Sequence, residues 1–184
     1  MNIRININVK IETARLQIIP LTIEQFQLLL KGMEQMEQAL ELKPSGECLD
    51  ANTQDAMEGL YKETLKHPDN YRWYTNWQII LKSENKAIGS ACFMKEPDEN
   101  HQVEIGYGMN KEYRNQGYMT EAVKAMCEWA FNQPDVESVI AETDADNFPS
   151  HKVLEKCGMQ KQEQPNGCIR WRLDKEWRSK PNYL

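Results

Sequence analysis

The sequence has no apolar run long enough to cross a membrane. None of its segments approaches the roughly 18 consecutive apolar residues that a transmembrane helix needs. The first twelve residues, MNIRININVKIE, also lack a continuous apolar stretch of signal-peptide length. We therefore expect a protein that does not associate with membranes.

Cysteine pairs of the metal-binding or redox type are also missing. The five cysteines are scattered along the chain, and no two of them form a Cys-x-x-Cys pair. We expect neither a metal site nor a disulfide framework, and a reducing cytoplasm is the simplest location for such a chain.

Positive charge is scarce, since the net charge is −6 and no basic stripe is present. Nucleic acid is disfavoured as a partner, because its affinity for proteins comes largely from neutralised phosphates. An acidic surface attracts cationic acceptors such as amines, but it also serves solubility alone, so charge does not decide the partner. With 184 residues and 40% apolar content, the chain can bury a substantial core and is expected to form one domain, 1–184.

The stretch 102–120 is the most informative part of the chain. Apolar and polar residues alternate over 102–109, which predicts a strand. Glu104, Gly106 and Gly108 share one face of it, so the backbone beyond the carboxylate is bare. A polar loop follows, and Gly117 then opens a segment with apolar residues at helical spacing.

A strand, a glycine-containing loop and a helix N-terminus in this order form an arrangement that binds phosphate. Backbone N–H groups converge there, and the helix dipole adds partial positive charge. The loop lacks the three glycines of a dinucleotide site and the Gly-Lys-Ser/Thr ending of a P-loop. On spacing alone, an ordinary connection between a strand and a helix is the alternative.

The remaining chain predicts a mixed α/β fold in the order β-α-α-β-β-β-α-β-α-β-β. Its sheet is mostly antiparallel and flanked by helices, with one parallel pair across the helix after Gly117. Residues 1–10 are expected to form an edge strand or a loose end, 34–49 a broken helix and a loop, and 165–167 a turn. Strands are expected over 12–20, 71–82, 86–95, 102–109, 138–143, 159–164 and 168–173, and helices over 23–33, 52–66, 117–132 and 147–157.

Four motifs resemble those of one enzyme family. Residues 113–122, YRNQGYMTEA, resemble the coenzyme A loop Gln/Arg-x-x-Gly-x-Gly/Ala of the GNAT superfamily of N-acetyltransferases, with Met119 in place of its last Gly or Ala. Residues 13–16, 103–107 and 147–159 resemble motifs of the RimJ/RimL-type branch of that superfamily. The resemblance covers about 11–173 and implies the GNAT fold and an acetyl-coenzyme A-dependent N-acetyltransferase.

The resemblance also implies site residues. Glu104 would be the catalytic base that deprotonates the acceptor ammonium, and Ser150 would donate a proton or hydrogen bond to the leaving sulfur. The residues expected to bind acetyl-coenzyme A are Tyr107, Met109, Arg114, Asn115, Gln116, Gly117, Tyr118, Met119, Thr120 and Asn147. Met119 fits if its side chain points into the core.

Each of these roles has a structural alternative. Glu104 also fits a solvent-facing or salt-bridged position, Ser150 a first-turn residue of a helix and Asn147 a plain helix cap. The tyrosine that much of the superfamily uses as the general acid is absent, since the aligned residue is Leu154. His151 is interpreted as a surface histidine, and the aromatic cluster 71–77 as core and sheet packing or as part of an acceptor pocket. Cys127 and Cys157 are expected to pack as small hydrophobes.

The resulting prediction is direct transfer of an acetyl group to a primary amine without a covalent enzyme intermediate. The acceptor is a protein or peptide N-terminus or a small amine, and the sequence does not choose between them. The alternative from another class is a catalytically weak module that only binds acyl-coenzyme A. A homodimer is expected from the habit of the family alone.

Overall fold

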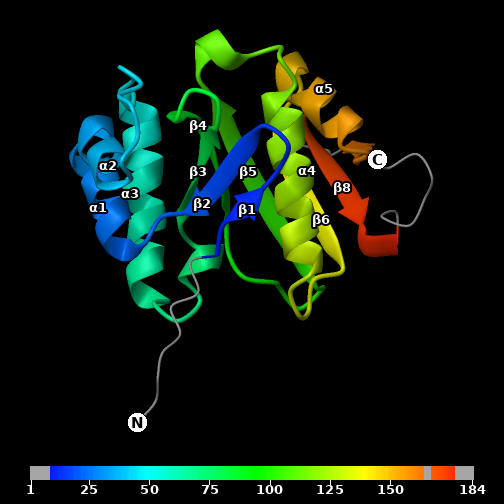
Figure 1. Cartoon of the computed structure of the whole chain (residues 1–184). Coiled ribbons are helices and arrows are strands. Elements are labelled where there is room, and N and C mark those ends of the chain that lie inside the picture. Colours follow the sequence, from blue (N-terminus) through cyan, green and yellow to red (C-terminus); the bar gives the residue numbers. More distant parts are fainter. Residues whose placement is uncertain (1–8, 164–166, 177–184) are drawn as a thin grey trace.

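The computed structural model describes residues 9–163 and 167–176, which form a single twisted sheet with helices on both sides (Figure 1). In this part of the chain the sheet has eight strands in the order β1-β2-β3-β4-β5-β6-β8-β7. The strands are β1 Ile11–Glu12, β2 Leu16–Pro20, β3 Asn76–Leu81, β4 Lys86–Phe93, β5 Gln102–Met109, β6 Ser138–Asp144, β7 Gln160–Glu163 and β8 Cys168–Asp174.

Five α-helices cover the two faces of the described sheet. They are α1 Ile23–Lys31, α2 Met33–Ala39, α3 Ala51–Lys66, α4 Tyr118–Phe131 and α5 Phe148–Lys156, and two 3-10 turns lie at Tyr71–Trp73 and Lys111–Tyr113. Figure 1 shows α1–α3 gathered on one side of the sheet and α4 and α5 on the other. Among the described residues, no helix combines the length and the apolar character needed to span a bilayer.

The sheet is antiparallel except where β5 lies parallel to β6, with α4 connecting the two strands. This confirms the predicted mixed, mostly antiparallel α/β class and its one parallel pair. The helices predicted over 52–66, 117–132 and 147–157 are present with ends shifted by at most one residue at each end.

Two predicted strands differ from the structure. The stretch 12–20 forms two strands, because a tight turn folds β1 back on β2; in this turn the Thr13 N–H donates to the Leu16 carbonyl at 3.0 Å. The stretch 71–82 begins with the 3-10 turn, so β3 starts only at Asn76. Of the expected features at 1–10 and 165–167, residues 1–8 and 165–166 lie outside the described part.

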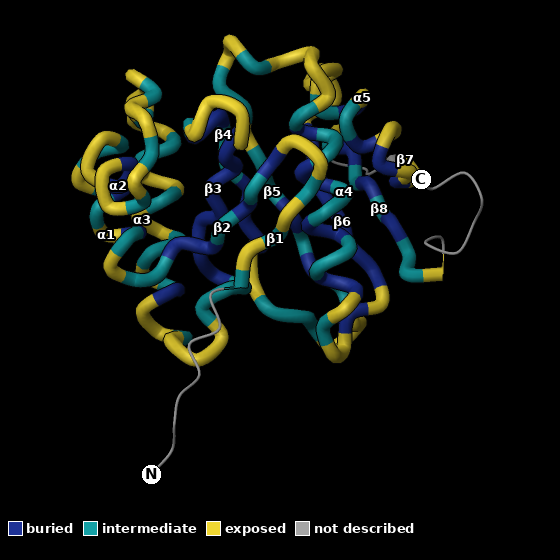
Figure 2. The backbone as a smooth tube through the Cα atoms, viewed as in Figure 1, coloured by how far each residue is buried: buried dark blue, intermediate teal, exposed yellow. Residues whose placement is uncertain are grey.

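Both faces of the central strands are covered, so β3 is buried along its whole length (Figure 2). One face packs on the apolar side of α4, where Val123, Met126 and Ala130 are fully buried, as their helical spacing predicted. The other face meets a smaller cluster that includes Phe26 and Leu29 of α1. The sheet is therefore a fixed platform between two helical layers, and its strand ends position the residues discussed below.

Candidate functional site

The two central strands β5 and β6 separate part-way along their length. They pair only through Gln102–Glu104 and Ser138–Ile140, after which β6 continues to pair with β8 on its other side. From Ile105 to Met109, the edge of β5 that faces β6 has no partner strand among the described residues. Its backbone N–H and C=O groups are available to an extended ligand, as at any open strand edge.

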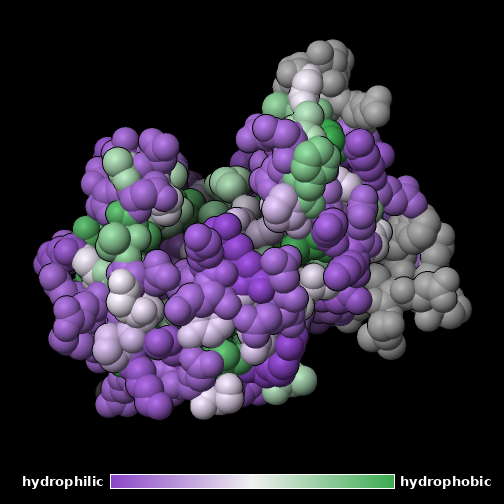
Figure 3. All heavy atoms as spheres, turned by 90° about the horizontal axis from the view of Figure 1, so that it is seen from above, coloured by the Kyte–Doolittle hydropathy of each residue, from purple (hydrophilic) through white to green (hydrophobic). Residues whose placement is uncertain are grey.

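A groove of about 720 Å³ lies where the strands separate, between the end of β5, the start of α4 and the start of α5. We call it the α4 groove. It is lined by Tyr107, Gly108, Met109, Tyr113, Arg114, Asn115, Gly117, Tyr118, Met119, Thr120, Asn147, Phe148, Pro149, Ser150, Lys152, Val153 and Lys156. Figure 3 shows this end of the molecule hollowed between two lobes.

The N-terminus of α4 opens into this groove without a cap. Its N-cap residue, Gly117, is left-handed at φ +80° and provides no side chain to cap the helix. The first backbone donor that the helix uses is the N–H of Glu121, which bonds to the Gly117 carbonyl at 3.1 Å. The N–H groups of Tyr118, Met119 and Thr120 therefore have no partner among the described residues, and together with the helix dipole they form an anion site.

Arg15, in the turn between β1 and β2, fixes this helix end from behind. Its Nε donates to Glu121 Oε2 at 2.7 Å, and its Nη1 donates to the Gln116 carbonyl at 3.0 Å. The guanidinium lies over the Tyr118 ring, 4.3 Å from its centroid. Thr13 and the Arg15 N–H both donate to the other oxygen of Glu121, at 2.6 and 2.9 Å. Both oxygens of one carboxylate in the first turn of α4 are thus held by a turn that lies about a hundred residues earlier in the chain.

The opposite wall of the α4 groove is the start of α5. The Asn147 side chain accepts the Ser150 N–H at 3.3 Å, so Asn147 is the N-cap of this helix. Tyr107 reaches across from β5 and donates its hydroxyl to the Ser150 carbonyl at 3.4 Å. Burial raises the pKa of the Tyr107 hydroxyl far above its ordinary value, so the group keeps its proton.

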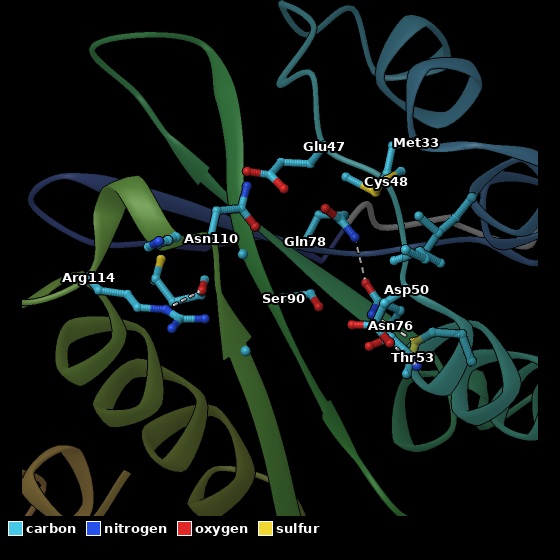
Figure 4. A pocket seen from close by; sticks show the side chains of 17 residues that line it. Met33, Glu47, Cys48, Asp50, Thr53, Asn76, Gln78, Ser90, Asn110 and Arg114 are labelled. Atoms are coloured by element: carbon cyan, nitrogen blue, oxygen red, sulfur yellow. Dashed lines mark hydrogen bonds between the residues drawn. The ribbon is translucent and has the colours of Figure 1, made fainter. Parts of the chain in front are cut away.

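A second groove, of about 330 Å³, lies on the other face of the sheet beneath the α1–α3 layer (Figure 4). We call it the α3 groove. Gln78, Ser90 and Gly108, which are register partners on β3, β4 and β5, lie side by side among its lining residues. The two grooves share Gly108, Met109 and Arg114, so they meet at the end of β5.

Comparison with known proteins assigns the chain to a family. A model of the acetyltransferase (GNAT) domain matches residues 15–160. The chain belongs to the GNAT family of acetyltransferases. The uncharacterized N-acetyltransferase YjdG of Bacillus subtilis is 30% identical to it over 150 residues, which cover 82% of this chain and 89% of that protein.

Solved structures share the GNAT fold at low sequence identity. Mycobacterium smegmatis RimJ, in complex with CoA-disulfide, has a TM-score of 0.67 at 13% identity and covers 96% of this chain and 92% of that one. Ribosomal-protein-S5-alanine acetyltransferase from Vibrio fischeri has a TM-score of 0.65 at 19% identity and covers 94% of this chain and all of that one. The protein is thus an N-acetyltransferase, and its acetyl donor is acetyl-coenzyme A.

The residues of the α4 groove fit that donor. Unpaired amides at the start of α4 suit a diphosphate, and the open edge of β5 suits an extended arm with amide groups. Nine of the ten residues predicted to bind the donor line this groove, and the exception is Gln116. Its side chain turns back to the Glu112 carbonyl at 2.8 Å, and its own carbonyl accepts from Arg15. The Met119 side chain is buried in the core, which is the condition under which we expected this longer side chain to fit the loop.

Sequence reasoning missed two lysines of this acetyltransferase. Lys152 and Lys156 line the α4 groove, four residues apart on α5, and both are exposed. Their spacing places them on one face of the helix, and that face also carries Phe148 at the rim. The i, i+4 pair was visible in the sequence, but which face of α5 the groove occupies was not.

The predicted catalytic residues lie in different places. Ser150 lines the α4 groove, whereas Glu104 lines neither groove. Glu104 lies where β5 and β6 begin to separate, on the face of the α3 groove, and Gly106 comes between it and Gly108 of the groove. Burial is the main cause that raises the pKa of Glu104, and nearby Glu142 adds to it, while Arg170 and Lys95 act in the opposite direction.

Three other expectations were settled by burial. His151 is buried, with Nε2 3.0 Å from the Asp144 carbonyl, so its interpretation as a surface residue was wrong. Trp73 and Trp77 pack against Trp129 of α4, which makes this part of the aromatic cluster core rather than acceptor pocket. Cys127 and Cys157 are buried, as expected for small apolar residues.

Proposed function

We propose that the protein acetylates a primary amine by direct attack, with the donor in the α4 groove and the amine entering from the α3 groove. The observation that carries this proposal is the meeting of the two grooves at Gly108 and Met109, beside the uncapped start of α4. Bound acetyl-coenzyme A supplies a thioester; the amine nitrogen bonds to its carbonyl carbon, the C–S bond breaks, and coenzyme A leaves as the thiol.

The start of α4 holds the diphosphate in this proposal. The amides of Tyr118, Met119 and Thr120 are its hydrogen-bond donors, and Arg114 adds positive charge at the rim. Arg114 is itself oriented, because its Nε donates to the Met109 carbonyl at 3.0 Å. Lys152 and Lys156 supply two further charges along α5 for the remaining phosphate of the donor.

Glu104 is the proposed base. An alkyl ammonium has a pKa near 10 in water, so little of it is nucleophilic at neutral pH. A carboxylate whose pKa is raised by burial accepts a proton more readily than an exposed one. Because Glu104 lines neither groove, the proton would reach it through water. The expected bare backbone beyond Glu104 is present only at Gly108, since the Met94 methyl group would lie 2.6 Å from a Cβ on Gly106, so the water would have to pass Met94.

Ser150 is the proposed hydrogen-bond donor to the leaving sulfur. Its N–H is used by the Asn147 cap and its carbonyl by Tyr107, and its hydroxyl lies within hydrogen-bonding reach of the Tyr107 hydroxyl, which keeps its own proton. Leu154, which takes the place of the tyrosine that much of the superfamily uses, is fully buried and has no proton to give. The hydroxyl of Ser150 is the group that remains at this wall of the α4 groove.

The buried Leu154 also supports a second candidate, a module that binds acyl-coenzyme A with little turnover. Release of coenzyme A thiol, measured with acetyl-coenzyme A and a panel of small amines and N-terminal peptides, separates the two. The enzyme predicts amine-dependent release that falls in Ser150→Ala and Glu104→Gln. Tight binding of acetyl-coenzyme A without release on any amine would favour the module.

The identity of the acceptor is open in this proposal. Several proteins of the same fold carry names that state a ribosomal-protein substrate, among them the S5-alanine acetyltransferase of Vibrio fischeri. At 19% identity such a likeness shows the fold alone. The lining of the α3 groove is therefore the better guide to the acceptor.

A further inference from the structure

We propose that the α3 groove takes a small diamine, with one nitrogen at Gly108 for acetylation and the other held as an ammonium by Gln78 and Asp50. The inference rests on the proposed acetyl transfer, which places the thioester where the two grooves meet. The distal ammonium keeps its proton and takes no part in bond making.

The first observation is a hydrogen-bond acceptor that faces the groove and has no donor among the described residues. Gln78 is 2% exposed, and its amide nitrogen donates to Asn76 Oδ1 at 2.7 Å. Asn76, equally buried, directs its own amide nitrogen at the Met57 sulfur, so the pair has a fixed orientation. The Gln78 amide oxygen accepts no hydrogen bond from any described residue and points into the groove (Figure 4). This oxygen is open to the groove and can accept a hydrogen bond from water or from a ligand ammonium there.

The second observation is negative charge on the helical side of the groove. Asp50 and Glu47 both line it, from the loop before α3. The backbone N–H of Thr53 donates to Asp50 at 2.8 Å and lowers the pKa of Asp50, so this carboxylate stays ionised at neutral pH. In Figure 4, Asp50 lies with Asn76 at one end of the groove, and Arg114 lies at the other.

The two ends of the groove therefore favour different protonation states of an amine. Lys111 lines the end at β5, where its positive charge disfavours an ammonium and favours the neutral, nucleophilic nitrogen. Asp50 and Gln78 line the other end, where an ammonium is stabilised. One molecule with two amines satisfies both ends.

The size and polarity of the space between these ends fit an alkyl chain. Gln78 and Gly108 lie two strands apart in register, and two strand spacings are about 10 Å. Ser90 lies between them on the sheet, and the helical side of the groove carries the apolar side chains of Met33, Leu49 and Met57. Methylene groups pack on such a wall, whereas the peptide groups of a protein N-terminus would need hydrogen-bond partners there.

The test compares two probes that differ only in the distal charge. N-acetyl-1,5-diaminopentane keeps the distal ammonium, and N-pentylacetamide lacks it; the acetamide fixes which end of each probe lies at β5. Isothermal titration in the presence of coenzyme A is expected to show the charged probe binding about tenfold more tightly. Asp50→Asn should remove most of this preference, while the asparagine keeps the helix cap.

Two further variants complete the design. Asp55→Asn removes the same charge from an exposed position on α3 that does not line the groove, so it should leave the preference unchanged. Gln78→Leu removes this hydrogen-bond acceptor and should weaken the charged probe alone. If that variant fails to fold in a melting experiment, Asp50→Asn decides the question.

Equal affinity for the two probes would overturn the inference, and so would a preference that survives Asp50→Asn. Tighter binding of an N-terminal peptide than of the charged probe would likewise overturn it. Thiol release with 1,5-diaminopentane is measured separately: selective binding without release keeps the diamine site and contradicts the proposed catalysis. Thiol release with other amines, without preferential binding of the charged probe, supports the proposed catalysis and contradicts the diamine site.

Discussion

Arg15 and Glu121 lie 106 residues apart in the chain and form an ion pair with 2.7 Å between Nε and Oε2. The pair joins the turn between β1 and β2 to the first turn of α4, directly behind the amides that face the α4 groove. Burial opposes ionisation of Glu121, but hydrogen bonds from Thr13 and Arg15 outweigh it and lower the pKa of this carboxyl. The carboxylate is therefore charged at the pH where the donor binds.

Replacing Arg15 by Ala is expected to weaken donor binding more than stability. The Arg15 side chain is 44% exposed, so the ion pair itself contributes about 0–1 kcal/mol to the free energy of unfolding. Loss of its contacts to Gln116 and Tyr118 frees the loop, and we expect the dissociation constant of acetyl-coenzyme A, measured by titration calorimetry, to rise about tenfold. An unchanged dissociation constant of acetyl-coenzyme A in Arg15→Ala would show that the Arg15 contacts do not position the loop.

Gly117→Ala tests the backbone at the same helix end. A side chain at φ +80° costs about 1–2 kcal/mol, and its Cβ would lie 3.4 Å from the Arg15 guanidinium. We expect lower thermal stability together with weaker binding of acetyl-coenzyme A. Gly167→Ala is the matched control. Gly167 has φ +79°, and a Cβ there would meet no described residue within 4 Å, so the variant should lower stability and leave donor affinity intact. Equal donor affinity in the two variants would contradict the role given to Gly117.

Glu104→Gln should raise stability at neutral pH while it lowers turnover. Because the folded state raises the pKa of Glu104 above its ordinary 4.5, ionisation of this carboxyl destabilises the fold. The variant is therefore expected to melt at a higher temperature at about pH 7, and its advantage should fade as the pH falls below 4.5, where the carboxyl becomes protonated in the unfolded state as well. A pH–rate profile of Glu104→Gln that matches the wild type would remove this residue from the mechanism.

Lys152 and Lys156 of α5 are expected to act on the 3′-phosphate of the donor. Lys152→Ala combined with Lys156→Ala is expected to raise KM for acetyl-coenzyme A about fivefold, in a salt-dependent way. The same double variant should leave KM for acetyl-dephospho-coenzyme A, which lacks the 3′-phosphate, unchanged. Lys62→Ala, an exposed lysine of α3 outside both grooves, serves as the charge control. Equal losses with both donors would assign the lysines a general electrostatic role.

Features with a local signal were predictable from the sequence. Alternation identified β5, and helical spacing identified the buried face of α4. The loop at Gly117 gave the start of the α4 groove only together with its resemblance to the coenzyme A loop, because spacing alone also fits an ordinary connection between a strand and a helix. The order of strands and helices then predicted the parallel pair of β5 and β6.

Features that depend on distant contacts were not predictable. His151 was misplaced because its burial depends on the Asp144 carbonyl and on Trp171 of β8, neither of which its neighbours in the sequence reveal. The α3 groove is built from α1–α3, the loop before α3, three strands and the loop after β5, so no single stretch encodes it. The hydrogen bonds from Thr13 and Arg15 to Glu121 were not predicted for the same reason, although Arg15 belongs to a motif that was recognised in the sequence.

Binding of the donor at the start of α4 is tested by titration of the isotope-labelled protein with coenzyme A, followed through its backbone amide resonances. We expect the largest shifts on the amides of Tyr118, Met119 and Thr120, with further shifts from Ile105 to Met109 along the open edge of β5. Shifts confined to other parts of the molecule, with these amides unmoved at saturation, would contradict donor binding at the start of α4.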